Sequence, residues 1–292
     1  MLPGGYSPQM DSELRIGTRV LNYSRYGHSG GVPVLSLGGS PSTRWKRPEV
    51  VAAIADAGLD VVFPDRPGYG GSTRQPGRTV AAAAADAAAL ADHLGWSAFA
   101  VTGGSGGGPH ALACAALLSD RVTRCAVVGG IAPPLTDGPQ PTQADEDADP
   151  RRNETSWLAA HEPASLRPLF EQSAAHIMSA VEAGGPEFPP DPGTPPGPPA
   201  RDDAEAMARL TATFVTSHDG WYDDLVAFAR PWGFDFADVA VPVRLWYGSA
   251  DERSRRYAEL LAGELSAERV EYAGGHIPPA PAYREVLGWL SR

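Results

Sequence analysis

The sequence predicts an α/β fold, in which a mostly parallel central sheet has helices on both faces and carries an inserted helical cap. Short apolar runs alternate with helix-like runs over residues 32–128. The alternation stops there and resumes only at Val243. Because parallel strands must be joined by crossovers, which are usually helices, this alternation favours a parallel sheet covered on both faces. The interruption predicts an insertion into that sheet.

The residue pattern of each segment predicts its secondary structure. Alternating polar and apolar residues predict an N-terminal hairpin, short apolar runs predict buried strands, and alanine-rich or amphipathic runs predict helices. The expected order is a hairpin over 14–26, strand 32–37, helix 48–57, strand 60–63, helix 80–94, strand 98–101, helix 109–118 and strand 122–128. After the insertion we expect strand 243–247, helix 255–265, strand 269–272 and helix 282–290.

The insertion predicts a second structural unit. We expect a core from residues 1–133 and 238–292, with a helical cap over 134–237 that includes helices near 165–181, 203–215 and 220–229. Residues 186–199 contain eight prolines, which excludes a helix or a central strand. This stretch is predicted to be an extended surface loop, either a plain linker or a loop that gates the pocket.

The composition narrows the class of partner. The 292-residue chain has a net charge of −11 and no cluster of Lys or Arg, which argues against nucleic acid. No apolar run approaches the ~20 residues of a membrane span, and residues 1–13 lack the features of a secretory signal. We therefore expect a cytoplasmic protein that acts on a small molecule without a membrane partner. The sequence leaves homodimer formation open.

The cysteines and the motif content indicate no disulfide framework and no prosthetic group. Cys114 and Cys125 each lie in an apolar run, so both are expected to be small buried hydrophobes. No metal-ligand cluster or cofactor motif is found. The expected metal and cofactor are therefore none.

Ser105 is the candidate nucleophile, in the run Gly103-Gly104-Ser105-Gly106-Gly107 between an expected strand and an expected helix. A serine on a tight strand-to-helix turn needs neighbours that are almost free of side chains, because the backbone there is strained. Chance is one alternative, since 33 of the 292 residues are Gly. A phosphate-binding turn over 106–111 is another, but the acidic residue expected about 20 positions later is absent.

His276 is the candidate base. A serine hydroxyl is a poor nucleophile at neutral pH, so it needs a base within hydrogen-bond reach and a third group that orients the base. His276 follows the last short strand, in a glycine-containing loop at the expected edge of the sheet. His110 is nearer in sequence but lies on the helix after the serine, so we expect it to point away and to be structural.

Asp251 is the candidate orienting carboxylate. It leaves the strand over 243–247 through a glycine turn and lies between the serine and the histidine in chain order. Glu252 is adjacent and stays open as an alternative. A purely structural role is also open, in which Asp251 only caps the following helix.

The backbone N–H groups of Gly106 and Ser40 are the candidate oxyanion donors. Charge that builds on a carbonyl oxygen needs preorganised donors, and these two residues follow the nucleophile and the strand over 32–37. Gly39 is the alternative to Ser40 as the second donor. A further alternative is that this glycine-rich segment forms only a tight turn. Because Gly106 has no side chain, we expect an open pocket wall beside it.

The candidate substrate-binding residues are Trp221, Tyr222 and His218, in the expected cap. An aromatic residue on a helix more commonly packs into a core. Packing inside the cap therefore remains the alternative for this set.

Together these motifs resemble the α/β-hydrolase fold superfamily over nearly the whole chain. The segments that carry the resemblance are Gly38–Pro41, Asp65–Ser72, Gly103–Gly107, Gly248–Asp251 and Gly274–His276. The resemblance implies a serine hydrolase with Ser105, His276 and Asp251 as its triad and an oxyanion hole at Ser40 and Gly106. A small-molecule ester or lactone is the expected substrate. Amide or C–C bond hydrolysis, and a slow or inactive ligand-binding homologue, remain alternatives, whereas the lack of Asp at the elbow argues against epoxides.

Overall fold

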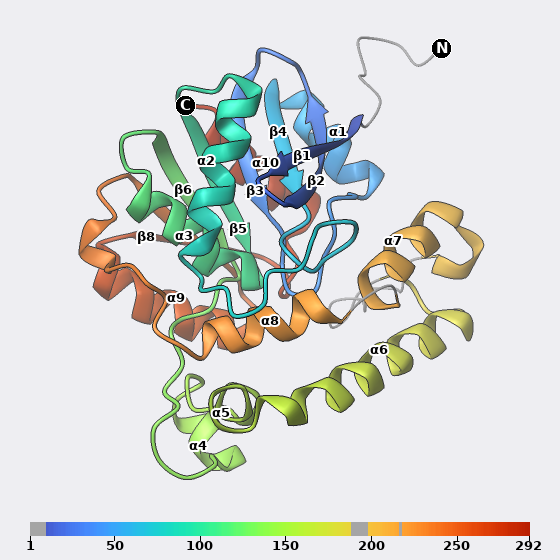
Figure 1. Ribbon diagram of the computed structural model, residues 1–292, viewed down its shortest axis with the longest axis vertical. Coiled ribbons are helices and arrows are strands. Elements are labelled where there is room, and N and C mark those ends of the chain that lie inside the picture. Colours follow the sequence, from blue (N-terminus) through green and yellow to red (C-terminus); the bar gives the residue numbers. More distant parts are fainter. Residues whose placement is uncertain (1–9, 188–197, 216–217) are drawn as a thin grey trace.

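The computed structural model describes residues 10–187, 198–215 and 218–292 and contains an eight-stranded sheet in the order β1-β2-β4-β3-β5-β6-β7-β8 (Figure 1). The five adjacent pairs from β4 to β8 are parallel, and β1 and β2 form an antiparallel hairpin at one edge. The strands are β1 Met10–Ile16, β2 Arg19–Gly27, β3 Val32–Leu37, β4 Leu59–Pro64, β5 Phe99–Gly104, β6 Val122–Val128, β7 Val243–Gly248 and β8 Glu268–Tyr272. The predicted fold class, a mostly parallel sheet, is confirmed.

Helices cover both faces of the sheet, each above its own apolar core. Helices α2 (Ala82–Leu94), α3 (Gly108–Leu117) and α9 (Glu252–Leu265) pack on one face, and α1 (Pro48–Asp56) and α10 (Ala280–Leu290) pack on the other. Strand β4 is buried along its whole length, as expected for a strand covered from both sides. Both cysteines are reduced and buried in the first core, as predicted.

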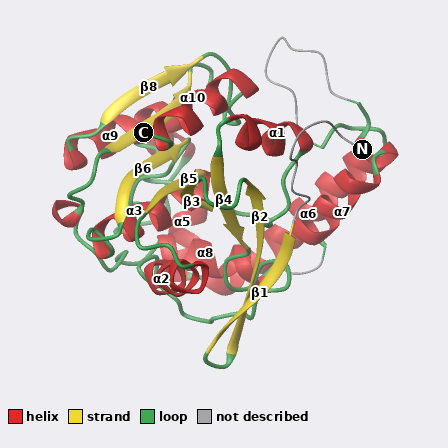
Figure 2. Cartoon of the chain, turned by 90° about the horizontal axis from the view of Figure 1, so that it is seen from above, coloured by secondary structure: helices red, strands yellow, loops and turns green. Residues whose placement is uncertain are grey.

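The chain between β6 and β7 forms further helices beyond the carboxyl ends of the strands. These are α4 (Gln143–Ala148), α5 (Glu154–His161), α6 (Leu166–Glu182), α7 (Ala204–Phe214) and α8 (Asp219–Phe228). Figure 1 shows α8 between the sheet edge and helices α5 and α6, and Figure 2 shows α6 and α7 side by side. Of the proline-rich segment 186–199, residues 188–197 lie outside the described residues.

Two of these helices, α4 and α5, were not expected from hydrophobic periodicity. Both are short and polar, and both begin at a side-chain cap: Thr142 forms a capping box with Asp145, and Asn153 accepts from the N–H of Ser156. Such caps satisfy backbone donors that a short helix would otherwise leave unpaired. The cap accounts for where both helices begin; α4 buries no residue, whereas α5 also buries Leu158 and Ala159 against α6 and α8.

The loops that follow β3, β4, β5, β6 and β7 meet at one edge of the sheet, because the carboxyl ends of parallel strands share an edge. Helix α8 contacts this edge directly, since the N–H of Gly220 donates to the carbonyl oxygen of Gly68 in the loop after β4 at 3.1 Å. Within the described residues, no helix is long and apolar enough to cross a membrane.

Candidate active site

Ser105 lies on a sharp turn between β5 and α3. Its φ is +49°, the left-handed region that a residue with a side chain rarely adopts, and the short 3₁₀ turn Ser105–Gly107 leads directly into α3. Strain of this kind persists only where the surroundings enforce it, and it is common at active sites. The sequence-predicted elbow is therefore present in the backbone.

The flanking glycines show what enforces the turn. A Cβ on Gly103 would overlap the carbonyl oxygen of Gly107, and a Cβ on Gly107 would overlap that of Leu37 at the end of β3. By contrast, a Cβ on Gly104 would meet nothing within 4 Å. Two of the glycines are thus required by close backbone approach, and the third is not.

His276 and Asp251 are joined, as the sequence predicted. Oδ2 of Asp251 accepts a hydrogen bond from Nδ1 of His276 at 2.6 Å. Their loops are tied together by the backbone: the N–H of Ala250 donates to the carbonyl oxygen of Gly274 at 2.9 Å, and the N–H of Ser249 donates to that of Tyr272 at 2.8 Å. The loops after β7 and β8 therefore hold the pair as one unit.

Asp251 also caps α9, so the helix cap and the contact with His276 coexist. Its Oδ1 accepts from the N–H of Ser254 at 3.0 Å while Oδ2 faces His276. Partial burial disfavours the charged carboxylate, but the hydrogen bonds from His276 and Ser254 outweigh it and lower the pKa of Asp251 to about 2. Glu252 is exposed and pairs with Arg255 at 2.5 Å instead. The geometry favours Asp251 as the partner of the histidine.

Gly129, directly after β6, lies against the ring of His276 and follows the strand partner of Gly104. Gly104, the residue before Ser105, is paired with Val128 across β5 and β6, so the turn lies beside Gly129. The ring of His276 lies against Gly129, where an added Cβ would be 3.1 Å from its Cε1. Among the described residues, no hydrogen bond joins Ser105 to His276. Catalytic hydrogen bonds are often long in unliganded enzymes and tighten when substrate binds.

The loop Gly38–Ser40 after β3 lies next to the elbow. A Cβ added to Gly39 would be 3.4 Å from the Cβ of Ser105, and one added to Gly106 would be 2.9 Å from the Cβ of Ser40 and 3.3 Å from the ring of Phe228. The expectation of an open wall beside Gly106 is wrong, because Ser40 and Phe228 occupy that space. Gly106 is required there so that this loop can approach the nucleophile.

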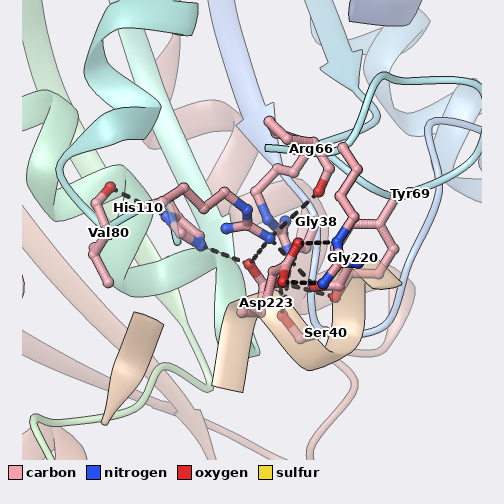
Figure 3. Close-up of polar contacts among 12 residues, drawn as sticks. Gly38, Ser40, Arg66, Tyr69, Val80, His110, Gly220 and Asp223 are labelled. Carbon is pink, nitrogen blue, oxygen red and sulfur yellow. Dashed lines mark hydrogen bonds and ion pairs between the residues drawn. The ribbon is translucent and has the colours of Figure 1, made fainter. Parts of the chain in front are cut away.

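A buried charged cluster adjoins this loop, and the sequence analysis missed it (Figure 3). Asp224 of α8 is fully buried; its Oδ2 lies 2.6 Å from Nη2 of Arg66 and 2.8 Å from the hydroxyl of Tyr69, and its Oδ1 lies 2.6 Å from Nη2 of Arg78. Burial opposes the charge on Asp224, but the two guanidinium groups hold its pKa well below the usual range. Helix α8 contains three aspartates, so the sequence alone did not single out Asp224.

His110 belongs to the same cluster, which accords with the structural role expected for it. It is buried, and its Nε2 lies 3.2 Å from Oδ1 of Asp224 and its Nδ1 3.3 Å from the carbonyl oxygen of Val80. Burial lowers the pKa of His110; the hydrogen bond and charge of Asp224 oppose this effect, and the neighbouring Arg66 and Arg78 act in the same direction as burial.

The three candidate substrate-binding residues lie on or next to α8, and most of their contacts are with other helices of the inserted region, although Arg74 of the core lies 5.9 Å from the ring of Tyr222. Trp221 stacks on Phe170 with ring centroids 4.5 Å apart, the guanidinium of Arg167 lies 4.8 Å from the ring of Tyr222, and Nε2 of His218 donates to the carbonyl oxygen of Phe214 at 2.8 Å. Trp221 and Tyr222 remain partly exposed. Packing is thus one function of these side chains, and substrate contact stays a prediction.

The fold and the site define the class of protein: an α/β sheet with a strained serine at the end of β5 and a hydrogen-bonded histidine–aspartate pair in the loops after β7 and β8. Comparison with known families agrees, because the pattern of the family described as alpha/beta hydrolase fold matches residues 32–278. The chain belongs to this family and is a hydrolase.

Similarity to individual proteins extends over most of the chain. A curated relative, Epoxide hydrolase A of Mycobacterium tuberculosis, is 27% identical, with 84% of this chain and 85% of the relative covered. Among solved structures, the enol-lactonase of Burkholderia xenovorans has a TM-score of 0.64 and 18% identity, covering 94% of this chain and 98% of its own. A carboxylesterase structure from Nitrososphaera gargenis has a TM-score of 0.65 and 16% identity, covering 96% and 98%. At these identities the structural likeness concerns the fold.

Proposed function

We propose that the protein is a serine hydrolase that cleaves a small-molecule ester or lactone through the triad Ser105, His276 and Asp251. The observation that carries the proposal is the positive φ of Ser105 at the carboxyl end of β5, because a strained serine is hard to explain by packing alone. The Asp251–His276 pair beside it supplies the base and its orienting partner.

In the proposed mechanism, Nε2 of His276 accepts the proton of the Ser105 hydroxyl as the serine oxygen attacks the substrate carbonyl carbon. The carbonyl oxygen becomes an oxyanion that accepts from the N–H groups of Gly106 and Ser40. The tetrahedral intermediate then expels the alkoxide, which receives the proton from His276, and an acyl-enzyme remains. Water, deprotonated by His276, then attacks the acyl carbon. The second tetrahedral intermediate expels the Ser105 oxygen, which takes the proton back from His276, and the acid is released.

The similarity to an epoxide hydrolase raises a second reaction, and the identity of the nucleophile argues against it. An aspartate that opens an epoxide forms an ester, which water can hydrolyse at its carbonyl. A serine that opens an epoxide would form an ether, which has no carbonyl for water to attack, and the enzyme would not turn over. Ser105 therefore favours a carbonyl substrate, although the relative that is 27% identical is named an epoxide hydrolase.

Several accompanying expectations belong to this proposal. The helical region over 134–237 would act as a cap on the core, with Trp221, Tyr222 and His218 facing the substrate. The net charge of −11 supports a protein without a nucleic-acid partner, and we place it in the cytoplasm. The same triad could serve an amide or a C–C bond, since the pocket rather than the triad decides between these substrates.

Intact-mass labelling with a fluorophosphonate tests the proposal without requiring the natural substrate. We expect one adduct that maps to Ser105 and is lost in Ser105→Ala and His276→Ala. Panels of p-nitrophenyl esters, lactones and styrene oxide would follow, with hydrolysis of the first two expected. A folded wild-type protein that takes up no label and cleaves no ester or lactone would contradict the proposal and favour a ligand-binding homologue.

A further inference from the structure

The loop Gly38–Ser40 is held by side chains that come from outside it. Its Ser40 hydroxyl donates to Oδ2 of Asp224 and accepts from Nη2 of Arg66 at 2.9 Å, so it has no proton left to offer a substrate. The backbone N–H of Ser40 has no hydrogen-bond partner among the described residues. A donor from this residue to the substrate must therefore come from the main chain.

Arg66 fixes the orientation of that main chain. Its guanidinium donates to the carbonyl oxygens of both Gly38 and Gly39, the latter at 2.9 Å. Because a peptide unit is planar and its C=O and N–H point in opposite directions, holding the Gly39 carbonyl aims the N–H of Ser40 away from Arg66. The same reasoning applies to the Gly38 carbonyl and the N–H of Gly39. Either candidate for the second oxyanion donor is thus oriented by one side chain.

Arg66 is in turn held by Asp224, 158 positions later in the chain and on α8. The carboxylate also binds Tyr69, Arg78 and His110, and it is fully buried together with them (Figure 3). No other carboxylate contacts Arg66 among the described residues. Loss of this charge would leave two buried guanidinium groups without a carboxylate partner, held only by neutral acceptors such as the carbonyl oxygens of Gly39 and Gly220.

On the basis of the proposed function, we propose that Asp224 is a positioning residue that makes the oxyanion hole depend on helix α8. Asp224 holds Arg66 and the Ser40 hydroxyl, and these two hold the peptide units of Gly38–Ser40 in the direction that stabilises the transition state. Among the described residues, the carboxylate of Asp224 makes no hydrogen bond with Ser105. The helix inserted between β6 and β7 thereby becomes part of the catalytic geometry as well as a cover for it.

Two matched pairs of variants separate this role from general stabilisation. Asp224→Asn is compared with Asp223→Asn. The Asp223 carboxylate lies on the same helix, but it binds the guanidinium of Arg74 at 2.8 Å and, within the described chain, does not bind the loop Gly38–Ser40. Ser40→Ala is compared with Tyr69→Phe, since each removes one hydroxyl that donates to Oδ2 of Asp224 but only the first belongs to the loop. The second pair keeps every charge and remains informative if Asp224→Asn does not fold.

We expect Asp224→Asn to lower kcat for the best ester about 100-fold with KM changed less than threefold, because oxyanion donors act in the transition state. Asp223→Asn should stay within twofold of wild type. Ser40→Ala should lower kcat about tenfold. Tyr69→Phe should cause a loss in kcat that is several-fold smaller, although the two variants should lose similar thermal stability. The affinity for a boronic acid, which mimics the tetrahedral intermediate, should fall in parallel with kcat, while inhibition by the product acid should not change.

Equal kcat in the two aspartate variants, or equal losses in Ser40→Ala and Tyr69→Phe, would overturn the positioning role while leaving the proposed function intact. Parallel losses in boronate and product affinity would also overturn it, because they would indicate a generally damaged pocket. If wild-type protein neither labels at Ser105 nor cleaves esters, the proposed function fails and the positioning role fails with it.

Discussion

Asp251 and His276 are 25 positions apart, yet Oδ2 of the aspartate lies 2.6 Å from Nδ1 of the histidine. The other carboxylate oxygen accepts from the N–H of Ser254 at the start of α9. One carboxylate oxygen of Asp251 is thus held at the start of α9, and the other binds the ring of His276. This arrangement determines the tautomer of His276, because a proton on Nδ1 leaves Nε2 able to accept one.

Asp251→Asn is therefore predicted to lower kcat by about 10⁴ without unfolding the protein. An asparagine can still cap α9, but its amide favours the wrong tautomer of the ring. Glu252→Gln is the matched control, since Glu252 is exposed and binds Arg255, and it should retain wild-type kcat. Steady-state kinetics of both variants decide the matter, and a loss in Glu252→Gln instead would transfer the orienting role to Glu252.

Ser105→Ala and His276→Ala are predicted to be non-additive. If the two side chains act in one proton transfer, removing either abolishes that step, and each single variant should lose at least about 10⁴ in kcat. The double variant should then be no slower than the slower single one. Rates of ester hydrolysis for the three variants test this, and multiplicative losses would show that the residues act independently.

The glycines of the elbow make a prediction about stability. Gly107→Ala should lower the free energy of unfolding by about 3 kcal/mol, because the new Cβ would overlap the Leu37 carbonyl and neither backbone can easily shift. Gly104→Ala should change it by less than about 0.5 kcal/mol, since the φ of Gly104 is −95° and the space around it is empty. Urea denaturation of both variants measures the contrast, and similar stabilities would contradict the turn geometry.

The alternating elements were predictable because each strand of this sheet is a compact apolar run. The strand over 32–37 was expected with the observed limits, and the others agree to within a few residues. Helices α4 and α5 were missed because they are short and begin at polar caps; α4 buries no residue, and α5 buries only Leu158 and Ala159. Periodicity therefore identified the longer elements and failed for two short helices whose starts are set by local hydrogen bonds.

For the site, the sequence indicated the residues that follow strands but missed those that act across the chain. Ser105, Asp251 and His276 each follow a strand end, so chain order alone brings them to one edge. Asp224 has no such signal, because its importance arises from contacts with Arg66 and Arg78, 158 and 146 positions earlier in the sequence. The open wall inferred from Gly106 was wrong for the same reason, since Ser40 and Phe228 reach it from other elements.

The pKa of Asp251 predicts how acid affects stability. A carboxyl group with a pKa of about 2 in the folded protein and about 3.9 in the unfolded chain binds protons more readily when unfolded. Its stabilising contribution is complete above about pH 5 and is lost as the pH falls toward 2. We expect the contribution to be about 2 kcal/mol at pH 5 and about half of that at pH 3.

Urea unfolding of wild type and Asp251→Asn at pH 5 and pH 3 isolates this contribution. The asparagine does not titrate, while every other carboxyl group is common to both proteins. The difference in unfolding free energy between the two should therefore shrink by about 1 kcal/mol between pH 5 and pH 3. A difference that stays constant would mean that the carboxylate gains nothing from His276 and Ser254 in the folded protein. The orienting hydrogen bond would then be too weak to fix the ring, and the assignment of Asp251 to the triad would fail with it.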